Sequence, residues 1–247
     1  MAAVAGKGGG LIEFLRHKAG LTYRQTWFAR RPTGSPWGLA LHRQYLGEPL
    51  KFPWVAEEFH TILIDLQQDD EALLAGMSKN MRSQLRKAEP GLMLELETKP
   101  DDFLSFYNAF ARGKGLKELS ASDLDKPAGT LALYRVSLEG KVLTQHAYLL
   151  DQQESRARFL YGGSARLEEG VDTSLLGRAN RWAHWQELRT FREQGIKTFD
   201  FGGYAWQTTD PAKQGINQFK EAFGGSVVQE NTYNSLLLAA VKALKRR

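Results

Sequence analysis

Apolar residues follow two different spacings along most of the chain. Residues 61–66, TILIDL, form a short apolar, β-branched run that is typical of a buried strand. Residues 67–89 instead repeat apolar side chains every three or four positions, which is the helical spacing, and the pattern stops before Pro90. The sequence therefore predicts a strand that leads directly into a helix.

The same patterns continue toward the C-terminus. They predict a strand at 92–98, a helix at 101–111, a short helix within 120–129, three antiparallel strands within 129–164, a helix at 172–195, a strand at 196–203, a helix at 210–225, a strand at 226–234 and a helix at 235–247. Turns are expected at Glu139-Gly140 and Gln152-Gln153. This alternation predicts a mixed α/β fold.

The N-terminal quarter of the chain has a different character. Residues 1–10 are rich in glycine, and residues 31–53 contain four prolines among glycines and aromatic residues. Such a composition predicts irregular or edge structure. We therefore expect an irregular N-terminal extension over residues 1–59 that packs on a domain formed by residues 60–247.

Composition narrows the choice of partners and chemistry. A formal net charge of +5 and a sequence pI near 9.3 favour an anionic partner. The sequence has no cysteine, which excludes disulfides, thiolate zinc sites and a cysteine nucleophile, and we expect no metal. Neither a signal-peptide core nor an apolar run long enough to cross a membrane is present, so we expect a cytoplasmic protein.

Three glycine-containing motifs occur in a fixed order in the second half of the chain. FLYGGSA (159–165) precedes the long predicted helix, FDFGG (199–203) follows it, and INQFKEAFGG (216–225) comes next. This order resembles the C-terminal part of the FemA/FemB/FemX family of peptidoglycan aminoacyl transferases and their single-domain acyltransferase relatives. KNMRSQLRKAE is similar to the basic helix at the corresponding place, and the resemblance covers about residues 60–233. It implies a GNAT-like fold with a central, mostly antiparallel sheet flanked by helices.

The resemblance also implies an N-acyltransferase. The leading hypothesis is transfer from acyl-CoA, for example acetyl-CoA, to an amine on a nucleotide- or lipid-linked amino sugar of cell-surface polysaccharide biosynthesis. One alternative is an aminoacyl-tRNA-dependent transferase of the FemX type. Another is a non-catalytic module that binds a glycan or a nucleotide sugar. FemA-type enzymes have two GNAT-like domains, and the segment before His60 is too short for a second one.

The donor remains open between CoA and tRNA. GNAT enzymes usually hold the CoA pyrophosphate in a (Gln/Arg)-x-x-Gly-x-(Gly/Ala) loop at a helix N-terminus. The corresponding segment here is GGSARLEEGVDTS, in which Arg166 and Gly170 are one residue too far apart for that pattern. A donor site would therefore use Gly162, Gly163 and Ser164.

Three residues are candidates for catalysis. The resemblance implies that Lys220, between Phe219 and Phe223, stabilises negative charge on the carbonyl oxygen during acyl transfer. His146, inside a predicted strand, has the pKa range of a general base, and the alternative is a core histidine bonded to backbone. Asp200 either orients the acceptor amine or holds the glycine loop that follows it.

Substrate contacts are predicted at six further places. Lys79, Arg82 and Arg86 share one helix face that either binds an anion such as a nucleotide diphosphate or a tRNA backbone, or is simply solvated. The remaining candidates are Tyr161, Tyr204 and Phe219. The closing basic helix either packs against the sheet or lies on the inner, anionic face of a membrane.

Overall fold

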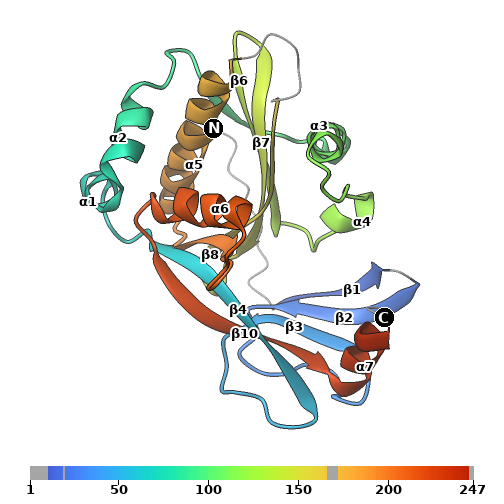
Figure 1. Cartoon of the computed structure of the whole chain (residues 1–247). Coiled ribbons are helices and arrows are strands. Elements are labelled where there is room, and N and C mark those ends of the chain that lie inside the picture. The colour runs from blue at the N-terminus through green and yellow to red at the C-terminus, as the bar shows by residue number, and fades with distance from the viewer. Residues whose placement is uncertain (1–10, 19, 166–171, 245–247) are drawn as a thin grey trace.

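The computed structural model describes residues 11–18, 20–165 and 172–244. A ten-stranded sheet runs through this part of the chain in the order β1-β2-β3-β10-β4-β9-β8-β7-β6-β5 (Figure 1). Its strands are β1 (Ile12–Lys18), β2 (Leu21–Trp27), β3 (Ala40–Tyr45), β4 (Trp54–Asp65), β5 (Met93–Leu96), β6 (Leu131–Leu138), β7 (Lys141–Asp151), β8 (Arg156–Ser164), β9 (Thr198–Gly203) and β10 (Ser226–Ser235). The helices are α1 (Asp70–Gly76), α2 (Lys79–Arg86), α3 (Pro100–Gly113), α4 (Ala121–Leu124), α5 (Thr173–Glu193), α6 (Pro211–Glu221) and α7 (Leu236–Leu244).

Most neighbouring strands in this sheet are antiparallel. Strands β5 to β8 form a continuous antiparallel meander, with turns at the two places that the sequence predicts. The pairs β2–β3 and β8–β9 are parallel. The expectation of a mixed α/β fold with a mostly antiparallel sheet flanked by helices is thus confirmed.

The N-terminal quarter is more regular than expected. Strands β1, β2 and β3 belong to the sheet, and β3 pairs with β10, a strand almost 190 residues later in the chain. The prediction of an irregular extension is therefore wrong for these strands, although residues 31–39 and 46–53 lie outside helices and strands. β4 itself crosses the boundary expected at residue 60.

The helix predicted over residues 67–89 is two shorter helices. α1 ends at Gly76, and Ser78 caps α2 by accepting the amide of Met81. Between the helices, the amide of Ser78 donates to the carbonyl oxygen of Ala222 at 2.9 Å. The interruption therefore lets the chain bond to the turn that follows α6.

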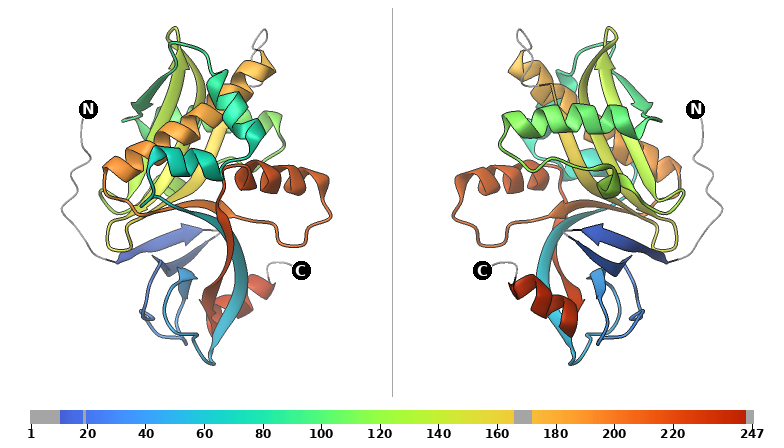
Figure 2. Two further views of the ribbon diagram at one scale, coloured as in Figure 1. Left: turned by 90° about the vertical axis from the view of Figure 1, so that its left-hand side faces the viewer. Right: turned by 90° about the vertical axis from the view of Figure 1, so that its right-hand side faces the viewer.

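The helices cover both faces of the meander. α5 lies on one face with α1, α2 and α6 nearby, and α3 and α4 lie on the other (Figures 1 and 2). On the α5 face, an aromatic core forms around Tyr148, Phe191, Phe199, Phe201 and Phe223. α7 packs its buried Leu238 against β2 and β3, and no described helix has both the length and the apolar composition needed to cross a membrane.

The parallel pair β8–β9 creates the space for a site. Pairing runs from Arg156 opposite Thr198 to Arg158 opposite Asp200 and then stops. Both strands continue beyond this point, β8 to Ser164 and β9 to Gly203. The two strands therefore separate in the middle of the sheet, and their free backbone edges face the opening.

Candidate active site

A cavity of about 420 Å³ lies where β8 and β9 separate, between α5 and α6. We call it the α5–α6 cavity. Several of the predicted site residues line it, together with side chains from α5 that the sequence did not single out: Gly162, Gly163, Ser164, Asn180, His184, Phe219 and Lys220. The structure thus brings together the predicted donor glycines and the predicted catalytic lysine.

Lys220 is the buried cation of this cavity. The residue is only 8% exposed, and its Nζ donates to the carbonyl oxygen of Gly203 at 2.5 Å, with a longer contact of 3.5 Å to that of Gly202. Burial and, to a lesser extent, the neighbouring charge of Arg158 lower the pKa of Lys220 to about 8. An ammonium has three N–H groups, so one remains for a ligand in the cavity.

The phenylalanines beside Lys220 are placed as their helical spacing predicts. Phe223 is buried and Phe219 is partly buried against the same aromatic core. Gly224 then adopts φ +87°, and a Cβ there would lie 2.4 Å from the carbonyl oxygen of Gly76. The paired glycines after α6 therefore permit a close contact between two segments of backbone.

Asp200 is fully buried beneath the turn that holds Lys220. Its carboxylate accepts the amide of Gly202 at 2.7 Å, the side chain of Gln44 at 2.8 Å and the guanidinium of Arg156 at 2.7 Å, and it also bonds the hydroxyl of Thr61. Burial raises the pKa of Asp200, but the charges of Arg156 and Arg158 and the hydrogen bonds to its carboxylate together hold this pKa below its usual range. This is the loop-holding alternative, and a direct contact with an acceptor amine is not made from this position.

His146 lies under the cavity and is not part of its wall. It is 1% exposed; its Nδ1 lies 2.8 Å from Glu187 and its Nε2 lies 2.9 Å from Oδ1 of Asn180. A Cβ on Gly162 would approach the His146 ring at 3.1 Å. Asn180 and Gly162 therefore stand between His146 and the cavity, so the predicted contact with an attacking amine would require a relay through Asn180.

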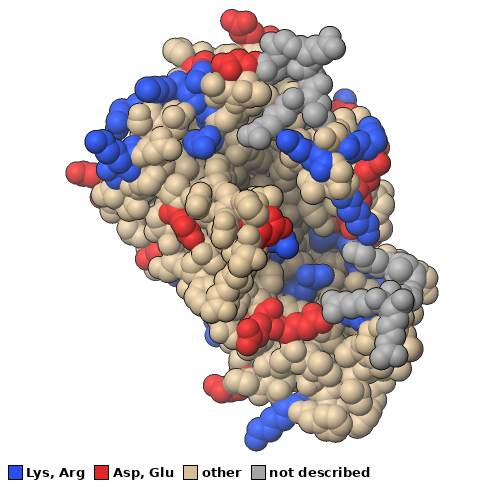
Figure 3. All heavy atoms as spheres, viewed as in Figure 1, with Lys and Arg blue, Asp and Glu red and all other residues tan. Residues whose placement is uncertain are grey.

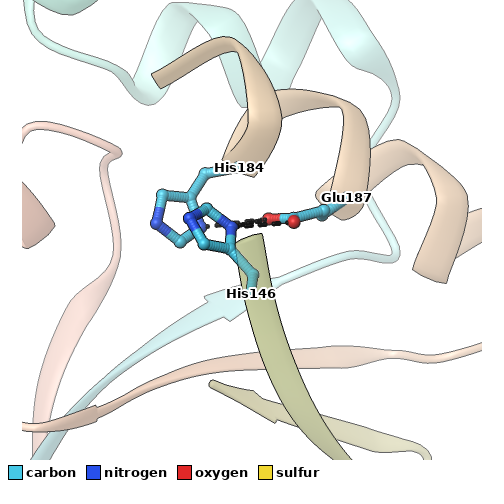
Figure 4. A group of neighbouring side chains, drawn as sticks. All are labelled: His146, His184 and Glu187. Atoms are coloured by element: carbon cyan, nitrogen blue, oxygen red, sulfur yellow. Dashed lines mark hydrogen bonds and ion pairs between the residues drawn. The ribbon is translucent and has the colours of Figure 1, made fainter. Parts of the chain in front are cut away.

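His184 and Glu187 were not predicted, and they complete this polar cluster (Figure 4). His184 stacks on His146 with ring centroids 4.3 Å apart, and its Nδ1 lies 3.2 Å from the Glu187 carboxylate. Burial and the nearby charge of His146 lower the pKa of His184 to about 4, so its ring is neutral at neutral pH. The signal in the sequence was a histidine and a glutamate three residues apart on the core-facing side of an amphipathic helix.

The same three residues could serve as metal ligands by type. Their donor atoms lie within 4.8 Å of one another, and all three side chains are buried. Each of these atoms is already hydrogen bonded within the cluster, and the hydroxyl of Tyr148 also donates to Glu187. The expectation that the protein uses no metal remains a prediction.

The helix N-terminus expected to meet a pyrophosphate is occupied by a side chain. Asp172 caps α5 by accepting the amides of Ser174 at 2.8 Å and Leu175 at 3.3 Å. A carboxylate in this position occupies the amide donors that a phosphate would need, and its negative charge repels a phosphate. Arg166 and Gly170 lie outside the described residues. The described part of the α5 N-terminus does not fit a CoA pyrophosphate.

The basic stripe on α2 lies apart from the α5–α6 cavity. Arg82 donates to carbonyl oxygens at the end of α1, including that of Met77 at 2.5 Å, and so caps that helix. Arg82 and Arg86 border a different pocket, between α2 and the side of α5 that carries Trp182. Lys79 is exposed. The structure does not bring these three residues to Lys220.

Two predicted tyrosines also lie elsewhere. Tyr161 points to the opposite face of β8, because the bulge between the β7 pairings of Phe159 and Tyr161 turns it away from the α5–α6 cavity. Tyr204 donates its hydroxyl to Glu221 at 2.6 Å on the outer side of α6. Of the predicted aromatic contacts, Phe219 alone lines the α5–α6 cavity as the structure describes it.

Solved structures share this architecture at low sequence identity. FemX superposes with a TM-score of 0.64 at 13% identity, over 98% of this chain and 89% of FemX. The fold is GNAT-like and related to that of FemX. The C-terminal domain of a putative lysylphosphatidylglycerol synthetase from Agrobacterium fabrum gives 0.57 at 13% identity, over 95% and 84% of the two chains. L-PGS from Bacillus licheniformis gives 0.54 at 13% identity, over 85% and 72%.

Comparison of the sequence alone assigns the chain to no family. No family model matches the chain, and no curated protein matches it. Because 98% of the chain superposes on FemX, most of the segment before β4 must take part in that likeness. The N-terminal strands are therefore part of the shared architecture, which the resemblance over residues 60–233 alone did not indicate.

Proposed function

We propose that this protein transfers an acyl or aminoacyl group from an activated ester or thioester to an amine, at the α5–α6 cavity. The observation that carries the proposal is Lys220, a buried ammonium with an available N–H at the place where β8 and β9 separate. The GNAT-like fold shared with FemX and with two lysylphosphatidylglycerol synthetase-type structures supports this class of reaction.

Lys220 would act on the oxygen of the donor carbonyl. When a neutral amine attacks the carbonyl carbon, negative charge develops on that oxygen, and a fixed cation in a water-poor cavity stabilises it. The carbonyl groups of Gly202 and Gly203 hold the ammonium in place before the reaction. The leaving sulfur or oxygen departs with the electron pair, and the proton of the amine passes to water or to the leaving group.

Two donors are compatible with this chemistry, and the structure favours one of them. Acyl-CoA needs a place for its pyrophosphate, and the capped N-terminus of α5 does not fit one. An aminoacyl ester carried by tRNA makes no such demand on α5. We therefore place aminoacyl-tRNA ahead of acyl-CoA as the donor.

The acceptor would be an amine on an anionic molecule, such as a nucleotide- or lipid-linked amino sugar. The positive net charge of the chain supports an anionic partner. A non-catalytic glycan-binding module would need a cavity but no buried ammonium inside it. Lys220 therefore favours an enzyme over such a module.

Calorimetry with purified protein distinguishes the donors. We expect aminoacylated tRNA to bind and acetyl-CoA to give no measurable heat. Transfer is then followed by mass spectrometry with amino-sugar nucleotides as acceptors. Tight binding of acetyl-CoA would reverse the choice of donor, and absence of transfer from both donors would contradict the enzymatic function.

A further inference from the structure

A second cavity, of about 220 Å³, lies on the opposite face of β8. It is enclosed by the N-terminal strands, by β8 and by the segment after α4, and we call it the β2–β8 cavity. Four cationic side chains line its wall, namely Arg16, Arg43, Lys126 and Arg158, and so does the ring of Trp27. Figure 3 shows Lys and Arg side chains gathered inside the hollow at the centre of the molecule.

Two of these arginines have incomplete hydrogen bonding. The Nε atoms of Arg43 and Arg158 are buried and have no hydrogen-bond partner among the described residues. Both guanidinium groups lie over the ring of Trp27, at 5.2 Å and 4.7 Å from its centroid. Buried donors are normally satisfied, so two unpartnered Nε–H groups, on guanidinium groups that face one cavity, indicate a ligand that accepts hydrogen bonds.

The nearby carboxylates do not neutralise these arginines. Asp123 pairs with Arg16, and Asp200 and Glu230 both bind Arg156 at 2.7–2.8 Å. Arg158 has only a 3.6 Å contact to Asp200, and no ion pair of Arg43 occurs among the described residues.

The ammonium of Lys126 adds a further positive charge to this wall. It is bonded to carbonyl oxygens, the nearer of which belongs to Asp123 at 2.5 Å. Burial and, to a lesser extent, the charge of Arg16 lower the pKa of Lys126 to about 8. The described wall of the cavity therefore carries excess positive charge.

The turn at Gly202 lies between the two cavities, at the end of β9. Arg158 lines the β2–β8 cavity, and a Cβ on Gly202 would lie 3.5 Å from its Nη2. Gly202 and Gly203 hold Lys220 in the α5–α6 cavity. A molecule bound through Arg158 would therefore lie close to the turn that holds Lys220.

We infer that the β2–β8 cavity binds a phosphate group, held by Arg43 and Arg158. A phosphate matches the two guanidinium forks with several acceptor oxygens, and its negative charge offsets part of the excess positive charge of the wall. The assignment of this phosphate to the amine-bearing acceptor rests on the proposed function, whereas phosphate binding itself does not.

Calorimetry of the full chain with inorganic phosphate and with pyrophosphate tests the inference. We expect binding that Arg43→Gln and Arg158→Gln each weaken by about tenfold or more, because each removes charge-assisted hydrogen bonds. Arg112→Gln, at an arginine of α3 whose side chain is 60% exposed, is the matched control and should bind as the wild type does. Unchanged binding in the Arg43 and Arg158 variants would overturn the inference.

Thermal unfolding separates a binding role from a structural one. Without phosphate, Arg43→Gln should unfold at the same or a higher temperature than the wild type, because it removes a buried, poorly compensated charge. Phosphate should raise the Tm of the wild type by more than it raises that of the variant. A variant that is less stable and keeps the full phosphate response would show that Arg43 is structural.

Two sources of the phosphate are distinguished by the probe. Uridine diphosphate N-acetylglucosamine represents a soluble acceptor, and vesicles of phosphatidylglycerol with phosphatidylcholine represent a lipid headgroup. Arg43-dependent binding to either one supports the site and names its source, and binding to neither contradicts it. Because no turnover is measured, a protein that binds phosphate but transfers no acyl group contradicts the proposed function alone.

Discussion

The Nζ of Lys220 lies 2.5 Å from the carbonyl oxygen of Gly203, so this lysine is fastened to the end of β9. The amide of the preceding residue, Gly202, donates to the buried carboxylate of Asp200. One short turn thus connects a buried carboxylate on one side with the ammonium in the cavity on the other. The position of the ammonium depends on the turn, and the turn depends on Asp200.

Replacement of Lys220 by methionine tests its role on the carbonyl oxygen. We expect kcat to fall by about 10²–10³ with a small change in KM, as for loss of one oxyanion donor. Lys213→Met, on the same helix and with a side chain that is 61% exposed, is the control and should keep wild-type activity. Wild-type turnover by Lys220→Met would rule out the role.

The pH dependence of turnover should report the lowered pKa of Lys220. With saturating acceptor, kcat should fall as the pH rises through about 8, because the neutral amine no longer stabilises an oxyanion. Between pH 8 and the ordinary lysine pKa of 10.5, the unfolded chain binds more protons than the folded one, so this group makes the fold more stable as pH rises. Deprotonation of Lys220 therefore does not unfold the protein, and unfolding from this cause cannot explain the fall in kcat. Lys220→Arg should shift the fall to higher pH, and an unchanged profile would contradict the assignment.

Gly224→Ala should destabilise the protein strongly. The added Cβ would meet the backbone of Gly76, and the positive φ adds strain, so we expect a loss of at least about 2 kcal/mol in the free energy of unfolding. Gly215→Ala on α6 is the control; no atom lies within 4 Å of the added Cβ there, and helix propensity predicts a gain of about 0.5–1 kcal/mol. Urea unfolding measures both. Equal stabilities would show that the contact between Gly224 and Gly76 does not matter.

The buried His184 should make the protein sensitive to mild acid. Its pKa is about 4 in the fold and 6.5 when unfolded, so below pH 6.5 the unfolded chain takes up a proton that the folded chain does not. Stability should fall by about 2 kcal/mol between pH 7 and pH 5 from this group alone. In His184→Gln this part of the slope should vanish, whereas His17→Gln, at an exposed histidine, should keep it. Identical slopes in wild type and His184→Gln would contradict the account.

Local pattern was sufficient for much of the fold, and the family resemblance indicated part of the site. The meander, α5 and the glycine turn after α6 follow from alternation, helical spacing and paired glycines, which are properties of neighbouring residues. The site roles of Lys220 and Gly163 were implied by the resemblance to FemA-type transferases, and the structure places both residues in one cavity. The sequence predicted these features without knowledge of distant contacts.

Features that depend on distant partners were missed. β3 is recognisable as a strand only through its pairing with β10, far along the chain. Arg82 was expected on an anion-binding helix face. The unpredicted end of α1 at Gly76 leaves free carbonyl groups, and Arg82 donates to these instead. Glu187 acquires its role from His146, which comes from another element. Spacing within one segment cannot reveal such pairings.

The place of β10 in the sheet has a consequence for the order of assembly. β10 lies between β3 and β4, so these two early strands join one sheet only when the latest described strand has inserted between them. During synthesis, strands β1 to β3 could pair with the remainder of the sheet only after β10 has been made. The β2–β8 cavity would therefore form last, and ligand binding there would require the complete ten-stranded sheet.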